Sequence, residues 1–186
     1  HFSSVYPNSV PETLLSFDED YVETQNMING TGYWLKFEDQ SSTLMLGDSI
    51  EDLSISLETG WNLISGLSEE IPLESIIDSE SIIVANTIYG YSNGYFAADS
   101  LAPGLGYWCR ANNDGIILIN YDHSDVNYLN NNELVDSLLN ISNQIIINEI
   151  STLYFNTHLS TNIDLKFSMP PKPPEGSFDA RFTNDL

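Results

Sequence analysis

Short runs of apolar and aromatic residues, each of strand length and each ended by turn residues, succeed one another along most of this 186-residue chain. The runs are rich in β-branched and aromatic residues, a composition typical of strands. Where the pattern is most complete, it predicts strands near residues 61–65, 82–91, 94–98, 106–111 and 115–120. Many short strands separated by turns that contain Gly and Pro predict an all-β fold.

One part of this pattern occurs twice. Residues 30–37 read Gly-Thr-Gly-Tyr-Trp-Leu-Lys-Phe, and residues 104–111 read Gly-Leu-Gly-Tyr-Trp-Cys-Arg-Ala, at an offset of 74 positions (104 − 30 = 74). The same offset relates Tyr21 to Tyr95. A repeat at a fixed spacing indicates one supersecondary unit that is used again. A duplicated β-unit is more often a scaffold or a binding surface than a single catalytic centre.

The repeat divides the chain into three predicted segments. Residues 1–50 form a first β repeat, residues 51–125 a second β repeat, and residues 126–186 a C-terminal β segment. The first repeat is incomplete at its start, because it lacks a counterpart of the Gly-Trp-Asn-Leu run at residues 60–63. We therefore expect the chain to be a piece of a longer protein. The predicted architecture is a tandem pair of small barrel-like or sandwich-like repeat units with a C-terminal β extension.

The last segment contains a dense run of prolines, Met-Pro-Pro-Lys-Pro-Pro, at residues 169–174. Proline fixes φ and has no amide hydrogen to donate, so this run is expected to be extended and to lie outside a sheet interior. Residues 141–186 offer too few apolar strands to close a core alone. We expect them to dock on the second unit, or on a neighbouring subunit by strand addition, with residues 170–174 crossing the surface as a strap.

The charge of the chain excludes some partners. There are 27 acidic and 5 basic residues, and the formal net charge is −22. Nucleic acid is therefore not an expected partner, because affinity for phosphates comes mainly from Lys and Arg. No stretch is apolar and long enough to predict membrane insertion. Cys109 is the single cysteine, which excludes an internal disulfide. It occupies the position equivalent to Leu35 in the first repeat, which predicts a small buried apolar side chain.

The candidate ligand-binding residues are Trp34, Lys36, Trp108 and Arg110. Each cation follows a Trp by two positions, so the two side chains share one face of a strand. In a structural interpretation, the cation lies against an aromatic ring or a carboxylate of its own unit and stabilises the strand register. In a functional interpretation, the pair forms an aromatic and cationic platform for a ligand such as a sugar. We favour the structural interpretation, because aromatic stripes are more often core than site.

Catalytic, metal-binding and cofactor-binding patterns are weak. His1, His123 and His158 are the histidines of the chain, and they lack the spacing of a known metal site. No Gly-x-Ser-x-Gly motif is present. Pairs among 27 acidic residues are too common to indicate a glycosidase. The sequence therefore predicts no enzyme activity, no catalytic residue, no metal and no cofactor.

Two motifs resemble a module of secreted and surface proteins of Bacteroidetes and related bacteria. They are Gly-Trp-Asn-Leu-Ile-Ser at residues 60–65 and Pro-Gly-Leu-Gly-Tyr-Trp at residues 103–108. The proline run, followed by Phe-Asp-Ala-Arg-Phe at residues 178–182, is similar to the approach to a C-terminal sorting region used by type IX secretion. The first repeat departs from the motif, with Ile-Asn-Gly at residues 28–30 instead of Pro-Gly. The resemblance implies an extracellular or outer cell-surface location and transfers no catalytic residue.

The function expected from these observations is a non-enzymatic extracellular structural or adhesive module of a larger secreted or cell-surface protein. Its expected partners are other extracellular proteins, copies of itself in filaments, or glycans. The alternative is a carbohydrate-binding module of a secreted enzyme, suggested by 10 Tyr and 3 Trp residues. An exposed, coplanar row of aromatic rings would favour that alternative. A secreted hydrolase has the least support and would need a deep pocket with a perturbed carboxylate pair.

Overall fold

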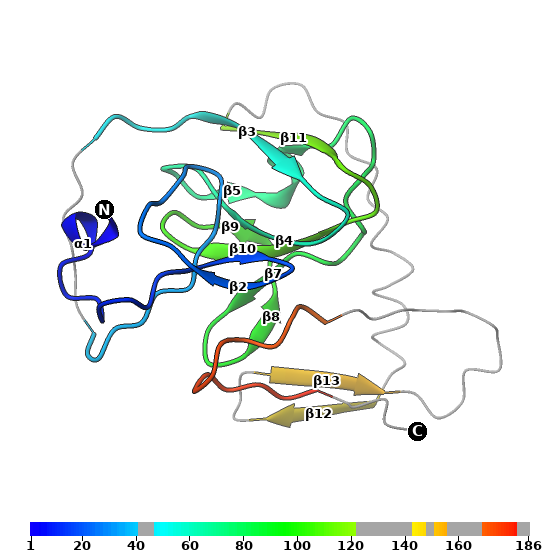
Figure 1. The fold of residues 1–186 in the computed structure, drawn as a ribbon. Coiled ribbons are helices and arrows are strands. Elements are labelled where there is room, and N and C mark those ends of the chain that lie inside the picture. The colour runs from blue at the N-terminus through cyan, green and yellow to red at the C-terminus, as the bar shows by residue number, and fades with distance from the viewer. Residues whose placement is uncertain (41–46, 122–142, 148–150, 156–168, 182–186) are drawn as a thin grey trace.

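The computed structural model describes residues 1–40, 47–121, 143–147, 151–155 and 169–181 (Figure 1). Almost all the regular structure in these residues is strand, which confirms the all-β prediction. One short helix, α1 (Phe2–Val5), and one 3₁₀ turn, η1 (Leu73–Ser75), accompany the strands. The strands are β1 (Leu15–Asp18), β2 (Asp20–Glu23), β3 (Asp52–Leu57), β4 (Gly60–Ser65), β5 (Ile71–Pro72), β6 (Ile76–Ile77), β7 (Tyr89–Tyr91), β8 (Tyr95–Ala97), β9 (Ser100–Leu101), β10 (Gly106–Ala111), β11 (Gly115–Asn120), β12 (Asn143–Ile147) and β13 (Ser151–Phe155).

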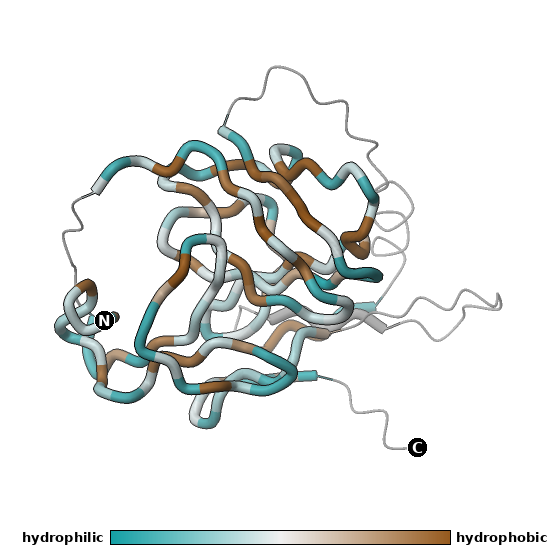
Figure 2. The backbone as a smooth tube through the Cα atoms, turned by 45° about the horizontal axis from the view of Figure 1, so that its top comes forward, coloured by the Kyte–Doolittle hydropathy of each residue, from teal (hydrophilic) through white to brown (hydrophobic). Residues whose placement is uncertain are grey.

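Two antiparallel sheets form the main body. One has the strand order β4-β10-β7-β8 and the other the order β3-β11-β6. Their inner faces share one core, in which Ile64 and Cys109 of the first sheet pack with Ile55 and Ile117 of the second. In β11 the side chains alternate, so that Ile117 is buried and Ile116 is exposed, as expected for a strand with one face on the core. Figure 2 shows apolar stretches along the strands of this body and hydrophilic residues at many of the turns.

A second, smaller core covers the opposite face of β4 and β10. Leu63, Tyr95 and Trp108 are its buried members. The β1 and β2 pair, called here the first hairpin, lies beside β4 and contributes to this core, and so does the β7 and β8 pair, called here the second hairpin. Within the described residues no helix is long and apolar enough to cross a membrane.

The two hairpins have the same strand pairing at the offset of 74 positions. Phe17 pairs with Tyr21 in the first hairpin, and Tyr91 pairs with Tyr95 in the second. Each hairpin turn contains a non-glycine residue with positive φ, at equivalent positions. These are Glu19 (φ +58°) and Asn93 (φ +54°). The two hairpins therefore have the same pairing at these equivalent positions.

Hydrogen bonds around the two Gly-Tyr-Trp segments also occur at equivalent positions. The Tyr33 hydroxyl accepts a bond from the Ile28 amide at 2.9 Å, and the Tyr107 hydroxyl accepts one from the Ala102 amide at 2.8 Å. The bridges between Leu15 and Trp34 and between Tyr89 and Trp108 are likewise equivalent.

The division into domains and the arrangement as two tandem closed units stay predictions.

Most strand limits predicted for the second repeat are confirmed, since β4, β8, β10 and β11 lie where the pattern predicts them. The strand predicted at residues 82–91 is wrong over most of its length, because β7 begins only at Tyr89. Ile83 forms an isolated bridge with Ala111, and Asn86 has a φ of +60°. A residue with the backbone in the left-handed region cannot continue an extended strand. Asn adopts this conformation more readily than most residues.

Candidate functional site: an aromatic interface closed by the proline-rich segment

The two repeats meet through reciprocal aromatic contacts, in each of which a ring from the hairpin of one repeat packs on the tryptophan of the other. Phe17 packs edge-on against Trp108, with ring centroids 4.7 Å apart and an interplanar angle of 85°. Tyr91 packs in the same manner against Trp34, with centroids 4.7 Å apart and an angle of 66°. Phe17 and Tyr91 are equivalent in the repeat, and so are the two tryptophans, so each repeat provides one ring to each contact. Such contacts contribute about 0.5–1.5 kcal/mol each beyond the area they bury.

Two equivalent tyrosines complete the interface. The ring of Tyr21 lies 6.4 Å from both Trp34 and Trp108. The hydroxyl of Tyr95 accepts a hydrogen bond from Trp108 Nε1 at 3.1 Å. The indole nitrogen of Trp34 is also buried, but it makes no hydrogen bond to any described residue, although it lies close enough to Tyr21 to affect the pKa of that hydroxyl. The two halves of the interface are therefore alike in packing and different in hydrogen bonding.

Residues 169–181, called here the proline-rich segment, cross this interface. The Tyr21 hydroxyl donates to the carbonyl of Lys172 at 2.8 Å, and the Tyr95 hydroxyl donates to the carbonyl of Pro171 at 2.8 Å. Equivalent tyrosines of the two repeats thus bind neighbouring carbonyls of one extended segment. Extended proline-rich backbone makes no internal hydrogen bonds, so its carbonyls are available as acceptors. The segment contacts both hairpins and not the second unit alone.

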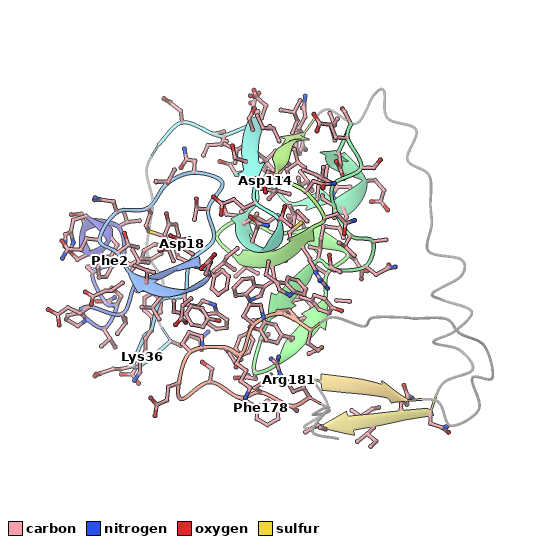
Figure 3. All side chains as sticks on the ribbon, turned by 45° about the vertical axis from the view of Figure 1, so that its right-hand side comes forward. Phe2, Asp18, Lys36, Asp114, Phe178 and Arg181 are labelled. Atoms are coloured by element: carbon pink, nitrogen blue, oxygen red, sulfur yellow. The ribbon has the colours of Figure 1, made fainter. Side chains whose placement is uncertain are left out.

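Further bonds hold the end of the proline-rich segment. Arg181 forms a two-point ion pair with Asp179, with Nε–Oδ2 and Nη2–Oδ1 distances of 2.7 and 2.8 Å. Its Nη1 also donates to the carbonyl of Pro170 at 2.9 Å. The Tyr91 hydroxyl donates to the carbonyl of Phe178 at 2.9 Å. Figure 3 shows Arg181 and Phe178 close together below the second hairpin. The guanidinium thus ties the two ends of the segment into a closed loop.

Burial affects the titration of several groups in and near the interface. It raises the pKa of Tyr95 to about 12. Burial, and then the neighbouring Tyr95, raise the pKa of Tyr21 well above the ordinary value. Both phenols are therefore neutral donors at physiological pH. Burial raises the pKa of the Cys109 thiol to about 12, with a smaller contribution from the charge of Asp78, so this thiol is not a nucleophile at neutral pH.

The structure brings two of the four candidate ligand-binding residues together. Trp34 and Trp108 belong to the aromatic interface, where Trp108 is 1% exposed. Lys36 is exposed at the periphery of the molecule (Figure 3). Neither Lys36 nor Arg110 forms an ion pair or a cation–π contact with any described residue, so the expected cation contacts are not found there.

The backbone at these two positions makes equivalent hydrogen bonds. The amide of Lys36 donates to Thr13 Oγ1 and the amide of Arg110 donates to Thr87 Oγ1, both at 3.3 Å. Backbone bonds of this kind do not depend on the charge of the side chain. The repeated position therefore has a repeated backbone role.

Sequence reasoning missed the residues that close the interface. The aromatic residues Tyr21 and Tyr95 carried a signal, since they match at the repeat offset. Their partners in the proline-rich segment carried none, because a backbone carbonyl can accept a bond whatever its side chain. The Arg181 and Asp179 pair was detectable only as two opposite charges two positions apart.

A cleft of about 800 Å³ lies between the first hairpin and the edge of β4. Its walls combine aromatic rings with acidic side chains from the β1–β2 turn and from the turn before β4. Its lining includes Phe17, Asp18, Glu19, Asp20, Tyr21, Glu58, Trp61 and Lys172. In the part of the chain that the structure describes, no group of three His, Cys, Asp or Glu side chains is placed to hold a metal ion.

Comparison of the chain with protein families, with curated proteins and with solved structures gave no match.

Proposed function

We propose that this protein is a non-enzymatic extracellular structural or adhesive module of a larger secreted or cell-surface protein. The observation that carries the proposal is the reciprocal packing of Phe17 on Trp108 and of Tyr91 on Trp34. These contacts use the most distinctive repeated side chains to join the two repeats, each of which contributes one hairpin ring and one tryptophan. A rigid pair of repeats is the expected form of a scaffold that presents surfaces to partners.

The proline-rich segment adds to this argument. It binds Tyr21 and Tyr95, one residue from each repeat, and so clamps the two hairpins together. The extracellular location is supported by the resemblance of residues 60–65 and 103–108 to modules of secreted bacterial proteins. A net charge of −22 agrees with a highly hydrated surface.

A surface-digestion experiment tests the location and the role together. Intact cells of the native host are treated with a protease, and the protein is followed with an antibody against residues 51–121. We expect loss of the signal from intact cells and a defect in attachment or in surface filaments when the gene is deleted. A signal that stays protected until the cells are lysed would contradict the proposal.

Carbohydrate binding is a second candidate, favoured by the cleft beside Trp61. The indole ring of Trp61 is partly buried, and acidic side chains that can accept hydrogen bonds from sugar hydroxyls line the same cleft. Trp108 is too buried to stack on a sugar, so this candidate depends on Trp61. Titration calorimetry with a panel of oligosaccharides tests it, with Trp61→Ala as the variant that must lose binding. Equal binding by the variant would exclude the cleft.

A further inference from the structure

The proline-rich segment turns two of its three sides towards the rest of the protein. A polyproline helix has three residues per turn, so residues three positions apart share one side of it. One side carries Pro170, which is fully buried, and Pro173, which is partly buried. The next side carries Pro171 and Pro174, both partly buried, and the third carries Lys172, which is exposed. The burial therefore has the period of a polyproline helix that is bound through its proline rings.

The aromatic interface offers the groups that such a segment can bind. Proline has no amide hydrogen, so its backbone can only accept hydrogen bonds. The hydroxyls of Tyr21 and Tyr95 donate to two neighbouring carbonyls, those of Lys172 and Pro171 respectively. Trp108 supports both donors, because its ring packs on Tyr21 and its nitrogen donates to Tyr95. A surface of aromatic rings with outward donors is typical of sites that bind proline-rich peptides.

The proline-rich segment fixes its own shape. Arg181 pairs with Asp179 and donates to the carbonyl of Pro170. The amide of Ser177 donates to the carbonyl of Pro174 at 3.1 Å. All these bonds lie within residues 170–181. We therefore expect the segment to dock as a preformed unit, whichever molecule carries it.

The main core does not depend on the proline-rich segment. Its buried members all lie between Ile55 and Ile119. The segment adds Met169 to the smaller core, as a partly buried member. Figure 1 shows the segment, in orange to red, beside β8 at the outside of the main body. The segment can therefore leave one copy and bind another without opening the main core.

The connection to the segment is long. Strand β11 ends at Asn120 and the segment begins at Met169, which leaves 48 residues between them (169 − 120 − 1 = 48). Connections between packed elements commonly have about 4–6 residues. A connection of 48 residues allows the segment to reach a neighbouring copy. Its contacts are then the same as within one chain, which is the condition under which identical copies exchange an element at low cost.

We infer that the aromatic interface is a recognition surface for an extended proline-rich segment, and that residues 169–181 of a second copy of this chain occupy it when copies assemble. Each copy provides one interface and one segment, so donation from copy to copy extends an assembly. This inference rests on the proposed structural function and names the contact through which the module assembles.

A fluorescent synthetic peptide with the sequence of residues 169–181 tests the recognition. It is titrated into the full chain carrying Arg181→Ala, whose own segment has lost its ion pair and its bond to Pro170. We expect the peptide to bind this variant about tenfold or more tightly than the wild-type chain, because the intact segment competes for the same interface. Absence of binding to the folded variant, or equal affinity for both chains, would overturn the inference.

Two matched peptides test the mode of binding. Pro170→Ala removes a buried ring, whereas Lys172→Ala removes a side chain on the exposed side. We expect the first substitution to weaken binding about tenfold, and the second to change it by less than about threefold. These peptides need no folding of their own, so their comparison is direct. Equal affinities of the two peptides would contradict recognition through the proline rings.

Sedimentation of the wild-type chain tests the second copy as the donor. It is measured at rising protein concentration and at physiological ionic strength, where the net charge of −22 is screened. We expect assemblies that an excess of the 169–181 peptide dissociates into single copies, and that the Pro170→Ala peptide leaves intact. Single copies at every concentration, or assemblies that the peptide does not affect, would overturn the inference. This arm decides the matter even if Arg181→Ala does not fold.

The surface-digestion experiment does not depend on the aromatic interface. A surface protein that sediments only as single copies would refute only this inference. Assembly that the peptide dissociates, in a protein that stays protected from the protease until the cells are lysed, would refute only the proposed location.

Discussion

Trp108 and Tyr95 are joined by a buried hydrogen bond, in which the indole nitrogen donates to the phenol oxygen at 3.1 Å. The phenol in turn donates to the carbonyl of Pro171 at 2.8 Å. One hydroxyl thus links the core of the second repeat to the proline-rich segment. In the first repeat the corresponding nitrogen, on Trp34, makes no hydrogen bond to a described residue. This difference makes the two halves of a repeated interface experimentally distinguishable.

Removal of the Tyr95 hydroxyl should cost more stability than removal of the Tyr21 hydroxyl. Tyr95→Phe leaves the Trp108 nitrogen and the Pro171 carbonyl unsatisfied, and we expect it to lower the free energy of unfolding by about 1–3 kcal/mol. Tyr21→Phe removes one bond to a carbonyl near the surface, with an expected loss of about 0.5–1.5 kcal/mol. Urea denaturation of the two variants measures the difference. Equal losses of unfolding free energy would show that the two bonds of the Tyr95 hydroxyl stabilise the fold no more than the single bond of Tyr21.

The two tryptophans should respond differently to the same substitution. Trp108→Phe removes the indole nitrogen that donates to Tyr95. It also leaves a cavity, because the Trp108 side chain is only 1% exposed. Trp34→Phe removes a buried nitrogen that makes no hydrogen bond to a described residue, so part of the lost packing is offset. We expect Trp108→Phe to be the more destabilising by about 1 kcal/mol or more. Thermal unfolding of both variants tests this order, and the reverse order would contradict the hydrogen-bond assignment.

Loss of the Arg181 side chain should release the proline-rich segment. Arg181→Ala breaks the ion pair with Asp179 and the bond to the Pro170 carbonyl, with an expected cost of about 1–2 kcal/mol for charged hydrogen bonds that are partly exposed. Exposed aromatic surface should then increase the fluorescence of the dye ANS. Lys172→Ala is the matched control, because Tyr21 binds the backbone carbonyl of Lys172 and not its exposed side chain. We expect this variant to change the free energy of unfolding by less than about 0.5 kcal/mol. Similar ANS binding by both variants would contradict the role of Arg181.

Stability should fall at alkaline pH. The folded protein has pKa values above the ordinary phenol value at Tyr21, Tyr89 and Tyr95, and that of Tyr95 is about 12. Unfolding exposes these phenols, whose ionisation near pH 10 then favours the unfolded state. The stabilisation is complete below about pH 9 and is lost as the pH rises from about 10 towards 12. Denaturation midpoints at several pH values, with tyrosinate absorbance as the second signal, test this sign. A midpoint that stays constant to pH 12 would refute it.

The limits of β10 and β11 were predictable because they depend on local chemistry. Alternation of apolar and polar residues, together with the turn at residues 102–104, is contained in a short stretch of chain. The offset of 74 positions likewise identified equivalent residues such as Tyr21 and Tyr95. The strand predicted at residues 82–91 failed where a local conformation, the positive φ at Asn86, overrode the apolar pattern.

The sequence by itself determined the all-β class, the equivalent residues of the two repeats and most strand limits of the second one, since each depends on neighbours along the chain. Only the tertiary structure decided that Phe17 packs on Trp108 and that the proline-rich segment crosses both hairpins. These contacts join residues far apart in sequence, and one partner is often a backbone carbonyl that every residue carries. Side-chain identity therefore cannot specify such contacts; the packing of the whole chain does.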